Sequence, residues 1–306
     1  MVIHDEVIIC EVGLRDGLQA EKIALSVQDK VTLAQKLSLS GIPRVELGSF
    51  VRTDLIPQMS GTEDVVRIMR AWAKEKGITT QFSVLVPNLK GLEKALSVNV
   101  EEIAIFASVT EKFSLANLNA SRHEVRERLK LVCSQALSAG IKVRGYLSVV
   151  FGCPYEGQVR IDEVLGAVEE LLNMGCYEIS LGDTIGVAHA GQVQTWLSEI
   201  GRRFPLRLFA GHFHDTRGQA LSNILVSYQM GIRVFDASFG GFGGCPYAPR
   251  STGNVATEEV LYLFQGLGQC TSIDMHQLLQ AADYLSQLIN RPLPSRLARS
   301  GLGKRG

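Results

Sequence analysis

Short runs of β-branched and aromatic residues alternate with amphipathic stretches along most of the 306-residue chain. Runs of the first kind are typical of buried strands, and apolar residues spaced three and four apart are typical of helices. The pattern predicts eight strands, at residues 7–12, 44–50, 81–87, 102–109, 142–150, 177–183, 207–215 and 233–240. Helical stretches lie between them, for example at 29–41, 123–140 and 161–175.

Several of the expected helices end in a glycine shortly before the next strand, as a helix C-cap requires; these are Gly41, Gly77, Gly140, Gly175 and Gly231. Strands separated by helices favour parallel pairing, because parallel neighbours need a crossover connection. Eight such units favour a (β/α)8 TIM barrel, with an open doubly wound sheet as the alternative. Additional C-terminal helices are expected within 257–290, followed by a frayed basic tail. We therefore expect one catalytic barrel domain over residues 1–306.

Composition narrows the class of protein further. Acidic and basic residues balance at 31 each, which gives no preference for nucleic acid or a membrane surface. There is no apolar run of transmembrane length and no targeting signal, so a cytoplasmic protein is expected. Six cysteines without a CxxC pair indicate reduced thiols, five of them structural. The sixth, Cys245, lies inside the glycine-rich stretch 240–254 and is unusual for a core cysteine.

Charged and metal-ligating residues gather where the predicted strands end, which is where a barrel of this kind holds its chemistry. They are Arg15 and Asp16 after the first strand, Glu46 in the second, Asp183 at the end of the sixth, His212 and His214 in the seventh, Asp236 in the eighth, and Cys245 and Asn254 beyond it. A packed core has no need of so many polar groups on one face. The pattern predicts an active site.

The sequence "HFH" is the strongest local signal. Residues i and i+2 of a strand face the same side, so His212 and His214 can reach one metal ion, although two hydrogen-bonded histidines are the alternative. Asp16 and Asn254 at neighbouring strand ends favour the metal. Two nitrogen and two oxygen ligands without a thiolate suit Mg2+ or Mn2+ better than a closed zinc site. Asp215 faces the other way and is interpreted as structural.

Three further charged residues are expected beside the metal. Arg15 either forms a simple ion pair with Asp16 or stabilises a developing oxyanion or enolate. Glu46 is expected to orient Arg15. For Asp183 the choice between a structural role and a proton relay stays open.

Five motifs carry a resemblance to a known family: "EVGLRDGLQ" (11–19), "GDTIG" (182–186), "HFHDT" (212–216), "GGCPYA" (243–248) and "GNVATEE" (253–259). From about residue 6 to residue 290 the chain resembles the hydroxymethylglutaryl-CoA lyases, which belong to a larger group of metal-dependent TIM-barrel lyases and acyl synthases. The resemblance implies metal-dependent retro-Claisen cleavage of 3-hydroxy-3-methylglutaryl-CoA to acetyl-CoA and acetoacetate. It also implies a place in leucine degradation and ketone-body formation.

The resemblance assigns roles to residues. It implies metal ligands at Asp16, His212, His214 and Asn254, catalytic residues at Arg15, Cys245, Glu46, Asp183 and His212, and substrate-binding residues at Arg15, Gln19 and Arg144. Glu258 matches a supporting position. The expected partner is a small acyl-CoA, with no nucleic acid and no membrane, and we also expect a homo-oligomer, a dimer.

Departures from the family lie at Ala20 and at residues 52–55, which border the expected mouth of the site. They leave the acyl group open and admit longer branched 3-hydroxyglutaryl thioesters. Two alternatives to the lyase are a Claisen-type transferase resembling the isopropylmalate and homocitrate synthases, and an inactive barrel that serves as a binding protein. The cysteine loop "GGCPYA" favours the lyase.

Overall fold

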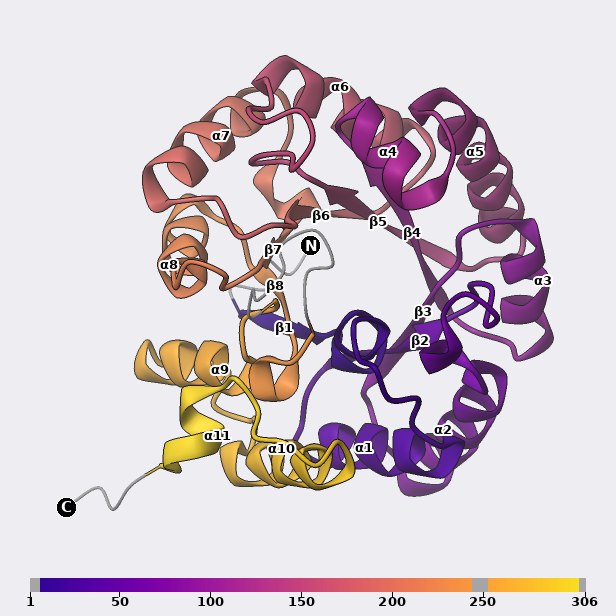
Figure 1. Ribbon diagram of the computed structural model, residues 1–306, viewed down its shortest axis with the longest axis vertical. Coiled ribbons are helices and arrows are strands. Elements are labelled where there is room, and N and C mark those ends of the chain that lie inside the picture. The colour runs from indigo at the N-terminus through magenta and orange to yellow at the C-terminus, as the bar shows by residue number, and fades with distance from the viewer. Residues whose placement is uncertain (1–5, 244–252, 303–306) are drawn as a thin grey trace.

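Eight parallel strands close into a barrel in the computed structural model, which describes residues 6–243 and 253–302. The strands pair in chain order and β1 also pairs with β8, so the sheet has no free edge (Figure 1). The strands are β1 (Ile8–Glu11), β2 (Arg44–Ser49), β3 (Gln81–Leu85), β4 (Glu102–Ser108), β5 (Lys142–Ser148), β6 (Glu178–Asp183), β7 (Phe209–Phe213) and β8 (Val234–Ala237). This confirms the predicted (β/α)8 barrel and excludes the open sheet.

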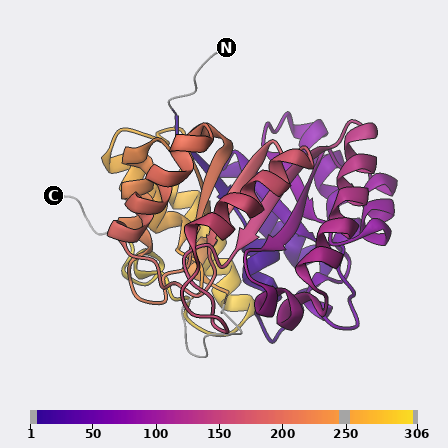
Figure 2. The ribbon, with the colours of Figure 1, turned by 90° about the horizontal axis from the view of Figure 1, so that it is seen from above.

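Helices surround the strands on the outside, as the view from the side also shows (Figure 2). They are α1 (Val27–Leu39), α2 (Thr62–Lys76), α3 (Leu89–Ser97), α4 (Glu111–Leu118), α5 (Arg122–Ser138), α6 (Ile161–Asn173), α7 (Ala190–Arg203), α8 (Ala220–Met230), α9 (Thr257–Gly266), α10 (Met275–Leu288) and α11 (Arg296–Ser300). In the described ranges, no helix is long and apolar enough to span a membrane. The five glycines predicted to end helices all have positive φ, for example 65° at Gly77 and 115° at Gly231.

The strands end earlier than predicted on the side of the barrel where the site lies. Strand β7 stops at Phe213, so His214 lies beyond it and forms an isolated antiparallel bridge with Asn254. Strand β5 stops at Ser148 because the next residue, Val149, has a φ of 55°, a left-handed conformation that cannot continue a strand. The last residues of these two predicted strands therefore lie outside the sheet, and among them His214 lines the cavity at the barrel mouth.

The C-terminal segment is ordered further than expected. The tail was predicted to be frayed from residue 296, but Arg296–Ser300 forms helix α11, with the Ser295 side chain accepting a hydrogen bond from Ala298 N at its start. Arg296 also forms a salt bridge with Glu259 of α9, with 3.0 Å between Nη1 and Oε2. Since its first turn is capped and paired, this part of the tail packs on the barrel. Residues 303–306 lie outside the description.

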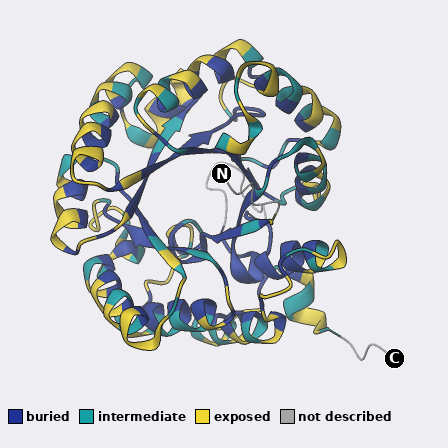
Figure 3. Cartoon of the chain, turned by 180° about the vertical axis from the view of Figure 1, so that it is seen from behind, coloured by how far each residue is buried: buried dark blue, intermediate teal, exposed yellow. Residues whose placement is uncertain are grey.

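Apolar side chains fill the space between the strands and the helices, and the helices α1 to α10 turn a buried face inward and an exposed face to solvent (Figure 3). The inside of the barrel is different. Leu85, Ala104 and Tyr146 form a small apolar cluster there, but charged residues occupy much of the remaining interior. Arg44 and Arg144 both bond Glu178, and Arg144 continues to Asp236. We call these four residues the interior ion chain.

Candidate active site

A single turn of π-helix, Gly13–Gly17, follows β1 and presents the first two site residues. The carbonyl of Val12 accepts hydrogen bonds from the amides of both Arg15 and Asp16, at 3.1 and 2.7 Å. These bonds fold the chain sharply back over the end of β1. As a result two neighbouring side chains, which would point apart on a strand, both line the cavity at the barrel mouth.

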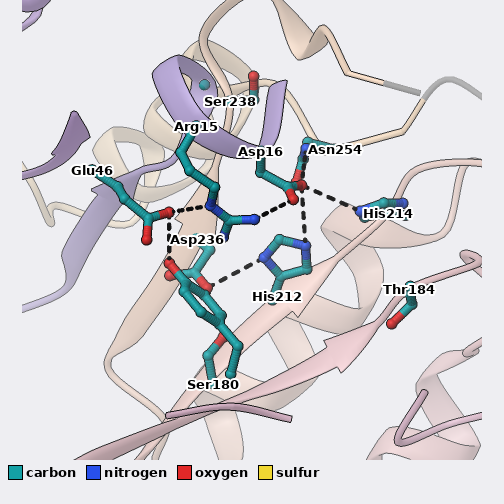
Figure 4. A network of polar contacts seen from close by, with 12 residues as sticks. Arg15, Asp16, Glu46, Ser180, Thr184, His212, His214, Asp236, Ser238 and Asn254 are labelled. Carbon is teal, nitrogen blue, oxygen red and sulfur yellow. Dashed lines mark hydrogen bonds and ion pairs between the residues drawn. The ribbon is translucent and has the colours of Figure 1, made fainter. Parts of the chain in front are cut away.

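Three predicted metal ligands meet at this mouth (Figure 4). The Oδ2 atom of Asp16 lies 3.9 Å from Nε2 of His212 and 3.9 Å from Nε2 of His214. Metal–ligand bonds of about 2.0–2.2 Å allow two ligand atoms of one ion to be about 4 Å apart, so the observed spacing fits a shared cation. Although burial opposes it, Arg15 and the two histidines hold the pKa of Asp16 well below its ordinary value, which keeps the carboxylate ionised.

Asn254, the fourth predicted ligand, lies beside the other three. Its Nδ2 atom donates a hydrogen bond to Oδ2 of Asp16 at 2.8 Å, and its backbone forms the bridge to His214. A half-turn of the amide would exchange Nδ2 for Oδ1, an atom that can bind a cation. Two imidazoles, a carboxylate and an amide oxygen suit a hexacoordinate ion with open positions.

Arg15 is held in place from three sides. Its Nε donates to Oε2 of Glu46 at 2.6 Å and its Nη1 donates to Oδ1 of Asp16 at 2.6 Å. The guanidinium carbon lies 4.8 Å from the centre of the Tyr146 ring, whose hydroxyl also donates to Glu46. Burial raises the pKa of Glu46 and Arg15 opposes that shift. Glu46 therefore orients Arg15 as the sequence indicated, and Tyr146 is a further support.

A cavity of about 340 Å³ opens from this cluster. One end is polar and includes Gln19, a predicted substrate-binding residue, together with Arg15, Asp16 and the two histidines. The rest of the wall is mainly apolar and comes from the ends of β3 and β4 and from α4 and α5; it includes Leu85, Pro87, Phe106, Phe113, Leu118, Val125 and Leu129. Arg52 and Leu55, from the segment that departs from the family, also line the cavity.

Arg144 was predicted to bind substrate, and the structure places it elsewhere. Its side chain is 1% exposed, and it is not among the residues that line the cavity. Nε donates to Glu178 at 2.6 Å and Nη2 donates to Asp236 at 2.8 Å. The residue points into the barrel from the middle of β5, where two carboxylates neutralise it, so this chain does not present Arg144 to the cavity.

Of the remaining predicted residues, Asp183 and Glu258 accept hydrogen bonds from backbone amides, and Cys245 lies outside the residues that the structure describes. Asp183 is 1% exposed, and its carboxylate accepts hydrogen bonds from the amides of Val187 and Ala188 in the turn after β6, while its catalytic role stays a prediction. Glu258 likewise accepts from the amide of Gly240. Cys245 lies outside the described residues, so its predicted catalytic role stays a prediction.

Asp236 was predicted to lie among the polar residues at the strand ends but without a role of its own, and it contacts three polar side chains. It accepts hydrogen bonds from Arg144 and from the Ser180 hydroxyl, the latter at 2.6 Å, and Nδ1 of His212 lies 3.3 Å away. Burial alone would raise the pKa of Asp236, but Arg144 and His212 hold it well below its ordinary value. The signal available in the sequence was an acidic residue facing inward within an apolar strand.

The HMGL-like family model matches residues 6–285. The chain belongs to this family. A curated relative from Pseudomonas aeruginosa, the 3-hydroxy-3-isohexenylglutaryl-CoA/hydroxymethylglutaryl-CoA lyase, is 45% identical over 304 residues, which are 99% of this chain and 100% of that protein. The family recognised from the motifs is therefore confirmed.

Two solved structures resemble this HMGL-like chain closely. The HMG-CoA lyase of Bacillus subtilis has a TM-score of 0.92 and 43% identity, covering 98% of this chain and 99% of that one. An HMG-CoA lyase from Acinetobacter baumannii, solved in complex with coenzyme A and 3-methylmalate, has a TM-score of 0.90 and 33% identity, covering 100% and 98%. The similarity extends over the whole barrel.

Proposed function

We propose that this protein is a carbon–carbon lyase that cleaves 3-hydroxy-3-methylglutaryl-CoA to acetyl-CoA and acetoacetate. The observation that carries the proposal is the cluster of Asp16, His212 and His214 beside Arg15 at one end of a cavity in an HMGL-like barrel. The reaction breaks the bond between C2 and C3 of the acyl chain. The tertiary hydroxyl loses its proton, its oxygen becomes the ketone of acetoacetate, and C2 leaves as the enolate of acetyl-CoA.

The described residues suit both ends of this bond. Asp16, His212, His214 and Asn254 would hold a divalent cation, which when bound makes the tertiary hydroxyl more acidic. Arg15 is buried with a permanent charge and lines the cavity next to them, so it can stabilise the enolate oxygen of the thioester. Glu46 and Tyr146 fix the guanidinium before substrate arrives. The thiol of Cys245 is the proposed proton donor to C2.

The activity is tested by incubating the purified protein with 3-hydroxy-3-methylglutaryl-CoA and Mg2+ and measuring acetyl-CoA by chromatography. We expect turnover that EDTA abolishes. His212→Ala should abolish it as well, whereas His276→Ala, an exposed histidine on α10, should leave the rate unchanged. Wild-type protein without turnover on this thioester and its longer homologues would refute the lyase.

Mg2+ or Mn2+ is the proposed cation. Support comes from the donor set of nitrogen and oxygen atoms without a thiolate in the cluster that the structure describes. Titration calorimetry of protein stripped of metal should show one site for either ion. If the Asp16→Ala variant bound Mg2+ or Mn2+ more tightly than the wild type does, the assignment of Asp16 as a metal ligand would be contradicted.

We also propose that the site accepts branches longer than methyl at C3. Four of the six residues that α4 and α5 contribute to the wall are apolar, namely Phe113, Leu118, Val125 and Leu129, and the P. aeruginosa relative carries isohexenylglutaryl-CoA in its name. Leu118→Trp adds bulk to this wall, so it should lower kcat/KM for a long-branch thioester more than for the methyl substrate. Leu115→Trp is the matched control, since Leu115 lies on the same helix, is 49% exposed and does not line the cavity. Equal effects of Leu118→Trp on both substrates would contradict this specificity.

A further inference from the structure

Asp236 lies between a proposed metal ligand and the interior ion chain. On one side, Nη2 of Arg144 donates to its Oδ1 at 2.8 Å. On the other side, its Oδ2 lies 3.3 Å from Nδ1 of His212 and accepts a hydrogen bond from Ser180 at 2.6 Å. The carboxylate is 1% exposed and sits on β8 directly across from His212 in the register of β7 with β8. Asp236 is therefore fixed in position before it meets the imidazole.

This arrangement selects one tautomer of His212. An ionised carboxylate can only accept hydrogen bonds, so the contact with Oδ2 requires the proton of the neutral imidazole to be on Nδ1. The other nitrogen, Nε2, then carries a lone pair, and it is this atom that lies 3.9 Å from Oδ2 of Asp16. The ring thus presents the atom that can bind a cation toward the proposed ligand cluster.

We propose that Asp236 is a positioning residue that orients His212 and fixes its tautomer for metal binding. The inference rests on the proposed metal site and goes further, because it explains why β8 carries a buried carboxylate that is not among the residues lining the cavity. Arg144 neutralises Asp236 from the side away from His212, at 2.8 Å from Nη2 to Oδ1. Partners of this kind typically change metal affinity by about 10- to 100-fold.

The competing interpretation is that Asp236 is only a counter-charge for Arg144. Two variants separate these roles. Asp236→Asn weakens the contact with His212 as well as that with Arg144, whereas Glu178→Gln removes the charge of the other carboxylate that Arg144 contacts and leaves His212 and Asp236 in place. A pure counter-charge role predicts that both variants lose stability and that neither alters metal affinity.

The experiment is a calorimetric Mn2+ titration of metal-stripped full-length protein, with thermal unfolding of each variant. We expect Asp236→Asn to weaken Mn2+ binding by about 10- to 100-fold and Glu178→Gln to leave it within twofold of wild type. Wild-type affinity in Asp236→Asn, or equal losses in both variants, would overturn the proposal. If His212→Ala retains wild-type affinity, the metal site itself is wrong, which is a different failure.

A second measurement uses the wild-type protein and therefore does not depend on whether a variant at Asp236 folds. In metal-free wild-type protein with 15N-labelled histidine, the ring signals of His212 are identified by their loss in His212→Ala. The proposal requires the neutral ring to carry its proton on Nδ1. A ring protonated on Nε2 would overturn the proposal whatever the variants show.

Discussion

Gly243 packs against two of the residues that form the proposed metal site. Its φ is +106°, and a Cβ atom there would lie 2.9 Å from Cα of Gly17 and 3.1 Å from Nδ2 of Asn254. The neighbour at Gly17 is backbone and cannot move aside cheaply. Any side chain at position 243 therefore pushes on the side-chain amide of Asn254 and on the turn that carries Asp16.

We expect Gly243→Ala to weaken Mn2+ binding measurably, because the added methyl group displaces the Asn254 amide from Asp16. The left-handed backbone by itself would cost ~1 kcal/mol of stability. Gly268→Ala is the matched control: its φ is +75°, and nothing lies within 4 Å of its would-be Cβ. Both variants should unfold at lower denaturant concentration. Equal metal affinity in the two would show that position 243 does not support the site.

At the scale of elements, Glu11 joins three segments that are far apart in the sequence. It is the last residue of β1, and its buried carboxylate accepts hydrogen bonds from the amides of Gly13 and Phe239 and from the hydroxyl of Thr257 at the start of α9. Phe239 begins the single turn, Phe239–Gly241, that follows β8. Glu11 thus holds the exits of β1 and β8 against the start of α9.

Burial raises the pKa of Glu11 from 4.5 to about 8, and the hydrogen bonds it accepts oppose that shift. Because the folded protein then binds a proton that the unfolded chain has lost, the free energy of unfolding should fall as pH rises from 4.5 toward 8. The contribution of Glu11 is complete below pH 4.5 and lost above pH 8, with a slope of at most about 1.4 kcal/mol per pH unit.

Urea unfolding at about pH 5, 6, 7 and 8 checks this expectation, because these values span most of the interval over which the pKa of Glu11 is raised. Glu11→Gln is less stable throughout, since its amide group faces backbone donors, but its side chain does not titrate. The difference in unfolding free energy between wild type and Glu11→Gln should therefore shrink as pH rises. A difference that stays constant from about pH 5 to pH 8 would mean that Glu11 is ionised in the folded protein throughout the range.

Strands and helices could be predicted from the sequence where the local residue pattern determines where they begin and end. The prediction was less accurate where contacts between residues distant in the sequence determine those ends. The eight strands follow from runs of apolar and β-branched residues, and Gly77 and Gly231 end helices as expected. The end of β7 was missed because His214 leaves the strand to bridge with Asn254, forty residues later in the chain. Helix α11 was missed for the same reason, since its salt bridge partner Glu259 lies on another helix.

At the scale of the whole molecule, the barrel interior explains the one misplaced site residue. TIM-barrel interiors are typically filled by layers of branched apolar side chains, which makes an arginine on a strand look like a site residue. Here Arg144 is paired in register with Glu178 of β6 and reaches across to Asp236 of β8. The partners of Arg144 are brought together only when the sheet closes into a barrel. The sequence motifs could therefore identify Asp16, His212 and His214 correctly as neighbours, but they could not reveal the interior ion chain.

The proposed metal ligands come from opposite ends of the chain, which gives the cation a predicted effect on global stability. Asp16 follows β1, whereas His212, His214 and Asn254 lie within the last third of the sequence, and β1 pairs with β8 to close the barrel. A bound cation ties the first and last units together and binds only the folded chain. At a metal concentration 100 times Kd, linkage predicts about 2.7 kcal/mol of additional stability.

Denaturant unfolding with and without Mn2+ measures this effect. We expect the midpoint to rise with metal concentration in wild type, and EDTA to reverse the rise. His214→Ala should show little or no increase, because it lacks one ligand of the cluster, while His276→Ala should respond as wild type does. An equal increase in His214→Ala would mean that the cation stabilises the protein from another site, and the assignment of the barrel mouth as the metal centre would then fail.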